Sequence, residues 1–334
     1  MSTEIRGLGE SELEAHAELV YRSYKEYADS GERPFLGDPH WWLKSVRSDP
    51  YYEPDQTRVM VLDGQLVASV SNYTREMYVD GRRAKVSCIG SVCTHPHHRR
   101  KGLIKQVLAE SIEWMQRHGF NWSFLFGREA VYGSSGWSLL TTFHLTADLR
   151  VRDEYGHSLN MRAADPGIDL AALARLYDQF NVKLSGPIVR SGAYWRQHLL
   201  VERLSQAVPT YNLLELEGRP VAYFWGHDAN ISEIAWVEAP LDVLAFLLRL
   251  WPGQPVKFHC YTTELIHHLR ALSHMTGYDD YIAHPGGINL HEAYKGLWRY
   301  IGDPDHRFPE ITDTASLKRL LRDREYIFWP TDGF

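Results

Sequence analysis

One short segment carries the residues that could do chemistry. Residues 92–105 read Val-Cys-Thr-His-Pro-His-His-Arg-Arg-Lys-Gly-Leu-Ile-Lys and join a short apolar strand to a long amphipathic helix that opens near Gly102. The first N–H groups of a helix have no partner within it, and the helix dipole favours negative charge there. Glycine lets a phosphate approach the backbone, and Arg99, Arg100 and Lys101 add positive charge. The segment predicts a diphosphate site, for a carrier such as coenzyme A; the alternative is a solvated basic surface.

The order of strand, basic turn and helix favours the binding site over the bare surface. The pattern Arg99-x-x-Gly102 after a Val-x-Thr strand end resembles the acyl-CoA signature of the GNAT N-acetyltransferases, Gln/Arg-x-x-Gly-x-Gly/Ala. Ile104 departs from that signature at its last position. The resemblance implies acetyl-CoA as co-substrate and no metal. The residues that it places around acetyl-CoA are Val92, Cys93, Thr94, Arg99, Arg100, Lys101, Gly102, Leu103, Ile104 and Lys105.

The elements that must position this segment follow from hydrophobic periodicity and turn residues. Asp63-Gly64 and Asp80-Gly81 are strong hairpin signals. At the start of the first helix, Ser11 and Glu14 fit a capping box. Helices are expected at residues 11–24, 39–48 and 102–118 with a short one at 129–136, and strands at 58–62, 66–73, 76–79, 85–94, 122–126 and 139–145.

The second half of the chain repeats this order of elements. After a polar stretch at residues 150–160, which is the best linker candidate, come helices at 170–180, 193–201, 241–250 and 264–273 and strands at 211–216, 220–225, 231–237 and 256–261. An internal structural repeat is the simplest interpretation. We predict an α/β (α+β) chain of tandem GNAT-like folds, with mixed, mostly antiparallel central sheets flanked by helices and a short C-terminal extension. The predicted domains are 1–150, which binds acetyl-CoA, 151–280, which is degenerate, and 281–334, a reduced C-terminal segment.

The repeat lacks the basic turn, because Glu238-Ala239-Pro240 follows its third strand and Glu238 would repel a diphosphate. Tandem GNAT folds with cofactor chemistry in the first alone resemble the Eis-type acetyltransferases. Two further segments carry this resemblance. Residues 129–137, Glu-Ala-Val-Tyr-Gly-Ser-Ser-Gly-Trp, are similar to the tyrosine-bearing segment of that family, and residues 185–196 to its central domain.

The Eis-type resemblance implies two catalytic residues. Carried over, Tyr132 is the general acid and the terminal carboxylate of Phe334 is the general base. An amine attacks a thioester only when it is unprotonated, so some group must take its proton. Residues 326–330, Tyr-Ile-Phe-Trp-Pro, are too apolar for a free tail, so we expect this end of the chain to dock.

The composition limits which classes of protein and which partners remain possible. The 334 residues, 44% of them apolar and 23% charged, suit a soluble protein of two domains. The sequence shows no signal peptide and no membrane span, so we expect a cytoplasmic protein without a membrane partner. The three cysteines and seventeen histidines form no metal-ligand spacing. A net charge of −6 argues against nucleic acid as a partner.

The function predicted is the transfer of an acetyl group from acetyl-CoA to a primary amine. The acceptor is a small molecule or a peptide, and a homo-oligomer stays open. The net charge of −6 favours a cationic acceptor, and a solvated acidic surface is the alternative explanation of that charge. Glu26, Asp29, Trp41 and Trp42 could bind such a cation, or they could be a solvated helix end and two core tryptophans. The alternative function is a non-catalytic regulatory protein that binds acyl-CoA.

Overall fold

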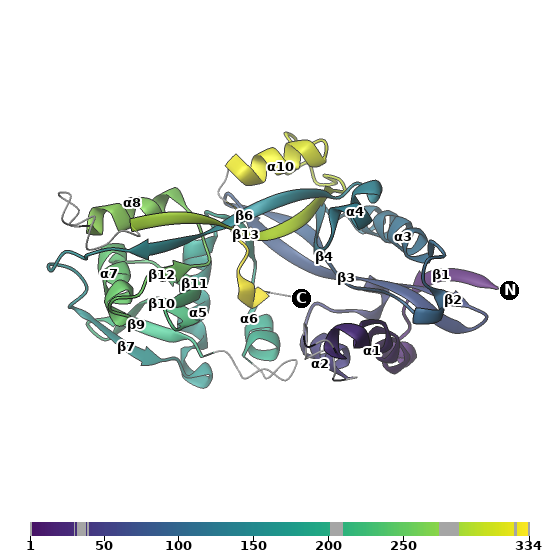
Figure 1. The fold of residues 1–334 in the computed structure, drawn as a ribbon, viewed down its shortest axis with the longest axis horizontal. Coiled ribbons are helices and arrows are strands. Elements are labelled where there is room, and N and C mark those ends of the chain that lie inside the picture. The colour runs from purple at the N-terminus through teal and green to yellow at the C-terminus, as the bar shows by residue number, and fades with distance from the viewer. Residues whose placement is uncertain are drawn as a thin grey trace.

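The computed structural model describes residues 2–29, 31, 38, 40–200, 210–273, 287–323 and 326–332. Its strands form a mixed, mostly antiparallel sheet that runs the length of the molecule (Figure 1), in the order β1-β2-β3-β4-β5-β13-β6-β12-β11-β10-β9-β7, with β8 paired to β3. The strands are β1 Thr3–Gly7, β2 Thr57–Leu62, β3 Gln65–Val79, β4 Arg82–Thr94, β5 Trp122–Phe126, β6 Ser138–Asp148, β7 Leu159–Ala163, β8 Ser185–Ile188, β9 Asn212–Leu216, β10 Arg219–His227, β11 Asn230–Trp236, β12 Val256–Phe258 and β13 Gly287–Tyr300.

Helices cover both faces of this sheet. α1 and α2 lie on one side of the first half, and α3 lies on the other (Figure 1). The helices are α1 Leu13–Asp29, α2 Trp41–Ser48, α3 Leu103–Arg117, α4 Glu129–Tyr132, α5 Pro166–Asn181, α6 Gly192–Tyr194, α7 Pro240–Leu250, α8 Thr263–Leu272 and α10 Thr314–Asp323. In the described ranges, no helix combines the length and the apolar character needed to cross a lipid bilayer.

Both Asp-Gly hairpins are confirmed. Asp63 and Gly64 have φ of 48° and 83°, and Asp80 and Gly81 have φ of 49° and 77°, as a tight two-residue turn between twisted strands requires. The predicted break between strands at 66–73 and 76–79 is wrong, because β3 is continuous. Arg75, the polar residue in its middle, does not mark a loop: it is buried and its Nη2 donates to Asp49 Oδ2 at 2.6 Å.

The predicted capping box at Ser11 and Glu14 is also wrong. A 3-10 turn, Glu10–Glu12, precedes α1, and the Glu12 carboxylate accepts from the Gly9 N–H at 2.9 Å. Arg6 of β1 fixes the same carboxylate through two bonds of 2.7 and 2.8 Å. The sequence analysis does not predict β1, so it does not predict that Arg6 pairs with the Glu12 carboxylate.

The main difference from the sequence analysis is β13. We predicted two central sheets, and β13 joins them into one by pairing with β5 from Gly296↔Phe126 to Tyr300↔Trp122 and with β6 from Gly287↔Asp148 to Trp298↔Ser138. No strand was assigned to its residues, because they mix charged and small residues with apolar ones. They reach their place by long-range pairing, which local pattern does not report.

The core divides into three clusters. One lies between the sheet and α3, and includes Ile89, Val107, Trp114, Leu125 and Trp137. A second lies on the opposite face under α1, α2 and α10, and the third fills the second half of the chain between α5, α7 and α8. The first cluster is the one that meets the predicted cofactor segment.

Candidate active site

The C-terminal end of β4 does not pair with the neighbouring strand β5. β5 runs parallel to β4 and pairs with it at residues 86–89, from Val86↔Trp122 to Ile89↔Leu125, while β4 continues to Thr94. A bulge lies just beyond: Ser91 has a φ of 48°, and the register of β3 with β4 shifts between Ser69 and Ser71. The bulge turns the last residues of β4 away from β5. Residues 90–94 are therefore an open strand edge inside the sheet, which can pair with an extended ligand.

Helix α1 holds this open strand end. The hydroxyl of Tyr24 donates to the Val92 carbonyl at 2.7 Å, and the hydroxyl of Ser23 donates to the Thr94 carbonyl at 3.3 Å. The Cys93 side chain points into the core, where burial raises the pKa of its thiol to about 11. Cys93 can thus contribute its backbone to a ligand, whereas Val92 is half-buried at the edge of the α3 cluster.

The turn into α3 has the backbone that an anion site needs. Arg100 and Gly102 both have left-handed φ, 63° and 72°, and the first hydrogen bond of the helix runs from Lys105 N–H to the Gly102 carbonyl at 3.2 Å. The N–H groups of Leu103 and Ile104 precede that bond, so neither has a partner inside the helix. A Cβ built on Gly102 would meet nothing within 4 Å, so the approach to these groups is open.

The basic residues of the turn fall into two groups. Arg99 is held by α1: it donates to the Ser23 carbonyl at 2.8 Å and pairs with Glu26 at 3.2 Å. Arg100, Lys101 and Lys105 are exposed around the turn. Of the predicted cations, the structure therefore leaves these three at the surface and uses Arg99 to fix the turn to α1.

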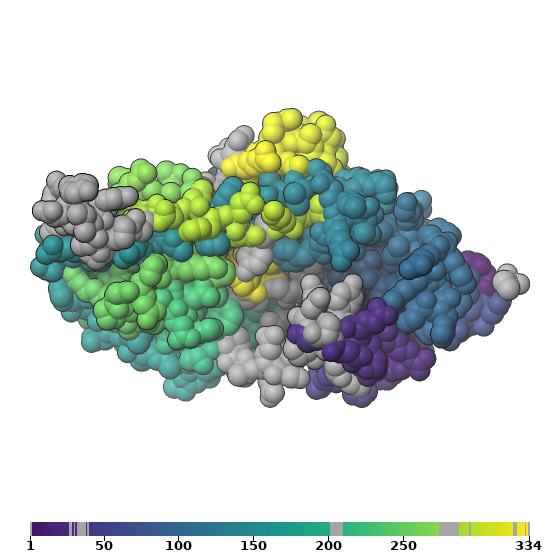
Figure 2. Space-filling view, in the orientation of Figure 1, coloured from purple at the N-terminus to yellow at the C-terminus, as the bar shows by residue number. Residues whose placement is uncertain are grey.

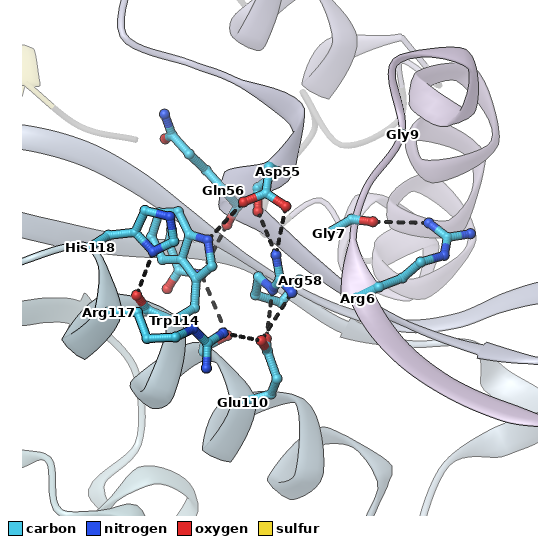
Figure 3. Close-up of polar contacts among 12 residues, drawn as sticks. Arg6, Gly7, Gly9, Asp55, Gln56, Arg58, Glu110, Trp114, Arg117 and His118 are labelled. Atoms are coloured by element: carbon cyan, nitrogen blue, oxygen red, sulfur yellow. Dashed lines mark hydrogen bonds and ion pairs between the residues drawn. The ribbon is translucent and has the colours of Figure 1, made fainter.

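A set of polar contacts anchors the later turns of α3 to the sheet (Figure 3). Arg58 of β2, whose side chain is 8% exposed, donates to Glu110 at 2.6 and 3.0 Å and to Asp55 at 2.8 Å. The indole of Trp114 donates to the other oxygen of Asp55 at 2.8 Å, and His118 stacks on Trp114 at 4.3 Å. These contacts fix the direction of α3 and hence of the turn at its start.

Tyr132 is the last residue of α4, which lies beside the α3 cluster. Its ring is half-buried and packs in the α3 cluster, with Val92, Leu103 and Ile104. Gly127, which follows β5, makes room for it: a Cβ there would lie 2.5 Å from Tyr132 Cε2. Burial raises the pKa of Tyr132 to about 12, so its hydroxyl stays protonated at neutral pH. Tyr132, the end of β4 and the start of α3 therefore border the same buried cluster.

The C-terminal segment docks, as its apolar residues predict. Phe328 packs its ring against Phe124 at 5.2 Å and Phe126 at 5.5 Å, and the Trp329 indole donates to Asn181 Oδ1 at 2.9 Å. The segment lies below the junction of β6 and β13, between the two halves (Figure 1). Phe334 lies outside the described residues.

A buried ion cluster holds the end of this segment. Arg190 donates to Asp332 at 2.9 Å and to both oxygens of Glu233 at 2.8 Å, and its guanidinium lies 3.9 Å from the centre of the Tyr177 ring. Burial, and then the neighbouring Glu233, raises the pKa of Asp332 above its usual range. Removing one partner of such a group leaves an uncompensated buried charge, so Asp332 is tied firmly to the second half.

The residues that we considered for a cationic acceptor are partly used elsewhere. Trp42 is fully buried and its indole donates to the Tyr73 hydroxyl at 3.0 Å, as expected for a core tryptophan. Glu26 pairs with Arg99, and Asp29 pairs with Lys25.

The sequence analysis does not predict Ser91, Gly127 or the Arg58–Glu110 pair, since a bulge and a close ring contact leave no local signal. In the described part of the chain, no three His, Cys, Asp or Glu side chains are arranged to hold a metal ion.

The arrangement defines a class of protein. Residues 4–140 match the family model described as an acetyltransferase (GNAT) domain. The chain therefore carries a domain of the GNAT N-acetyltransferase family, which implies an acyl-CoA co-substrate. The open end of β4 and the glycine turn of α3 fit that co-substrate, because they offer strand-edge amides and helix-start N–H groups beside exposed cations.

Solved structures share the fold over most of the chain. A protein of unknown function from Enterococcus faecalis, described as a probable N-acyltransferase, is 15% identical with a TM-score of 0.67, over 90% of this chain and 73% of its own. A GCN5-related N-acetyltransferase from Anabaena variabilis is 11% identical with a TM-score of 0.62, over 90% and 73%. Eis1 from Mycobacterium abscessus is 15% identical with a TM-score of 0.61, over 90% and 74%. At these identities the likeness shows the fold alone. The chain matches no curated protein by sequence.

Proposed function

We propose that the protein transfers an acetyl group from acetyl-CoA to a primary amine of a cationic acceptor. The observation that carries this proposal is that Tyr132, Val92, Leu103 and Ile104 all pack against one buried cluster, beside the open turn at Gly102. These residues supply a proton donor, a strand edge and a turn suited to an anion, and thioester aminolysis needs in addition a base for the proton of the amine.

In this proposal acetyl-CoA lies along the end of β4. Its diphosphate binds the N–H groups at the start of α3, with Arg100, Lys101 and Lys105 around it. The amide groups of its pantetheine arm pair with residues 92–94 of the strand edge. Arg99 contributes indirectly, by holding the turn against α1.

Tyr132 acts as the general acid. The amine nitrogen attacks the thioester carbonyl, the C–S bond breaks, and the thiolate of coenzyme A takes the proton of the Tyr132 hydroxyl. A phenol whose pKa is about 12 is a weak donor to a thiolate in water. Burial in the site would raise the basicity of the coenzyme A thiolate as well, which brings the two groups closer in pKa and favours the transfer.

The proton lost by the amine goes to the terminal carboxylate of Phe334, by analogy with the Eis-type enzymes. Support comes from the docking of Phe328 beside Phe124 and Phe126 and from the Asp332–Arg190 bond. A short extension after Phe334 should abolish turnover and leave acetyl-CoA binding intact. A C-terminally tagged protein with normal activity would remove Phe334 from the mechanism.

We further propose that the chain is a tandem of two GNAT-like folds of the Eis type, with domains at 1–150 and 151–280 and a reduced segment at 281–334. Each half contains a parallel strand pair joined by one helix: β4 and β5 through α3, and β11 and β12 through α7. In each, the helix follows a residue with left-handed φ, Gly102 at 72° and Ala239 at 51°.

The deciding experiment is thiol release from acetyl-CoA with a panel of polyamines, aminoglycosides and lysine-containing peptides. Release that depends on one class of amine supports the transferase and names its acceptor. Tight acetyl-CoA binding without release for any amine would instead support a regulatory protein that binds acyl-CoA.

A further inference from the structure

A second basic site lies beside the α3 cluster, whose Trp137 forms part of its wall. A cavity of about 560 Å³ opens between α10 and the start of β6, and this volume suits a small-molecule ligand. α10 forms a ridge on the surface of the molecule (Figure 2, yellow) and lies near α4 in Figure 1. One wall of the cavity is α10 and the other is the segment Glu129, Gly133, Gly136, Trp137 and Ser138.

The α10 wall is basic. Lys318 and Arg322 lie one turn apart on one face of the helix, and Arg319 beside them lines the same cavity. The opposite face carries Leu317 and Leu321, both fully buried, which prevents α10 from turning these cations away. Such a concentration of positive charge contrasts with the net charge of −6 of the chain.

The opposite wall leaves this charge largely uncompensated. Glu129 is the one carboxylate among the lining residues, and its Oε1 already accepts from the Leu139 N–H at 3.2 Å. Lys318 donates to the Ser138 hydroxyl at 2.8 Å, which holds its ammonium group at the cavity wall without neutralising it.

A fourth cation lies directly behind the wall. A Cβ on Gly136 would overlap Nη1 of Arg299, which donates to the Ser135 carbonyl, and the guanidinium lies 5.0 Å from the centre of the Trp137 ring. Burial lowers the pKa of Arg299. Its Nε is buried and, within the described ranges, has no hydrogen-bond partner. A half-buried cation of this kind gains stability from an anion bound nearby.

We propose that this cavity binds a phosphate-bearing small molecule. Two arginines and a lysine of α10 offer the forked and point-like donors that phosphate oxygens accept, and Arg299 adds charge behind them. The site is distinct in its residues from the α3 turn and does not depend on acetyl transfer. The phosphate could belong to a free metabolite or to the nucleotide end of the acyl-CoA, and the chemistry of recognition is the same.

The test uses inorganic pyrophosphate as probe and calorimetry on the full chain. Because the α3 turn could also bind the probe, the reference protein is the triple variant R100M/K101M/K105M. It should still bind pyrophosphate, and adding K318M and R322M should weaken that binding roughly tenfold or more. Adding R175M, a surface arginine of α5, is the matched control and should change nothing. Melting temperatures of all variants report folding.

Absence of binding in the triple variant, or binding that K318M/R322M leaves unchanged, overturns the proposal. The double variant K318M/R322M of the otherwise native chain shows which molecule carries the phosphate. Weaker binding of acetyl-CoA but not of its 3′-dephospho form assigns the phosphate to the co-substrate. Unchanged binding of both, with pyrophosphate binding lost, assigns it to a separate metabolite. Either result supports the site.

Discussion

The two strand–helix joints of the molecule have similar backbones and opposite chemistry. In the first half, β4 leads through Arg100, Lys101 and Gly102 into α3. In the second half, β11 leads through Val237, Glu238 and Ala239 into α7. Both helices follow a residue with left-handed φ.

The difference lies in the donors and the charges. α7 begins with Pro240, which has no N–H, and Asp242 of its first turn accepts the Gly156 N–H at 2.8 Å. Glu238 adds negative charge and pairs weakly with Arg219 at 3.6 Å. The α3 turn instead has free N–H groups and exposed cations. Two joints with similar backbones can therefore favour an anion or repel one through a difference of three or four residues.

The largest effect that we predict is a loss of kcat without a loss of acetyl-CoA affinity, and it concerns the first half. Tyr132→Phe keeps the ring against Gly127 and removes the proton donor, so kcat should fall by on the order of 10²–10⁴. Acetyl-CoA affinity, measured by calorimetry, should stay unchanged, because the ring still packs in the α3 cluster. An unaltered kcat under conditions where chemistry limits the rate would exclude Tyr132 as the acid.

The next prediction compares two glycines with the same backbone. Gly102→Val should weaken acetyl-CoA binding on the order of a hundredfold, since the side chain blocks several charge-assisted N–H contacts. Gly218→Val, in the second half, is the control: its φ is 75° against 72° for Gly102, and a Cβ at either position meets nothing within 4 Å. Both variants should lose similar stability, and the control should bind acetyl-CoA normally. Equal affinities for both variants would contradict the anion site at α3.

A smaller effect tests the anchor of α3. Glu110→Gln removes one of the two carboxylate partners of Arg58, a side chain that is 8% exposed, while Asp55 still pairs with it, and should lower the free energy of unfolding by roughly 1–3 kcal/mol. Glu238→Gln, near α7, breaks an exposed pair and should cost about 0–1 kcal/mol. Urea denaturation of both variants measures the difference. Similar losses would mean that α3 depends on its apolar face alone.

The smallest effect at neutral pH concerns His16 of α1. Its ring is fully buried, 4.2 Å from Trp42, and burial lowers its pKa to about 3. The unfolded chain binds a proton near pH 6.5, so the contribution to stability is complete above that pH. It is lost at roughly 1.4 kcal/mol per unit as the pH falls toward 3.

His16→Leu should therefore flatten the dependence of unfolding free energy on pH between 7 and 5, as chemical denaturation at the two pH values would measure. His259, in the second half, is half-buried with a pKa of about 4 and should contribute to the same slope. A His16→Leu variant with an unchanged slope would show that His16 does not cause the acid sensitivity.

Much of the first half could be predicted because its signals are local. Asp-Gly turns require left-handed φ, and Gly102 at a helix start allows one. The basic turn is a short pattern of the same kind, whereas the tyrosine segment was predicted from its resemblance to the Eis-type family. The bulge at Ser91, the room made by Gly127 and the use of Arg99 against α1 could not be predicted, because each depends on residues that are distant in sequence.

The sequence by itself determined most of the helices, the two Asp-Gly hairpins and the chemical character of the α3 turn, since backbone preference and side-chain charge belong to the residues themselves. Only the tertiary structure decided how the halves join. β13 enters the sheet between β5 and β6, and Asp332 is tied to Arg190 and thus to Glu233. Strand pairing and buried ion pairs gain their free energy from partners far along the chain, so no local pattern can specify them.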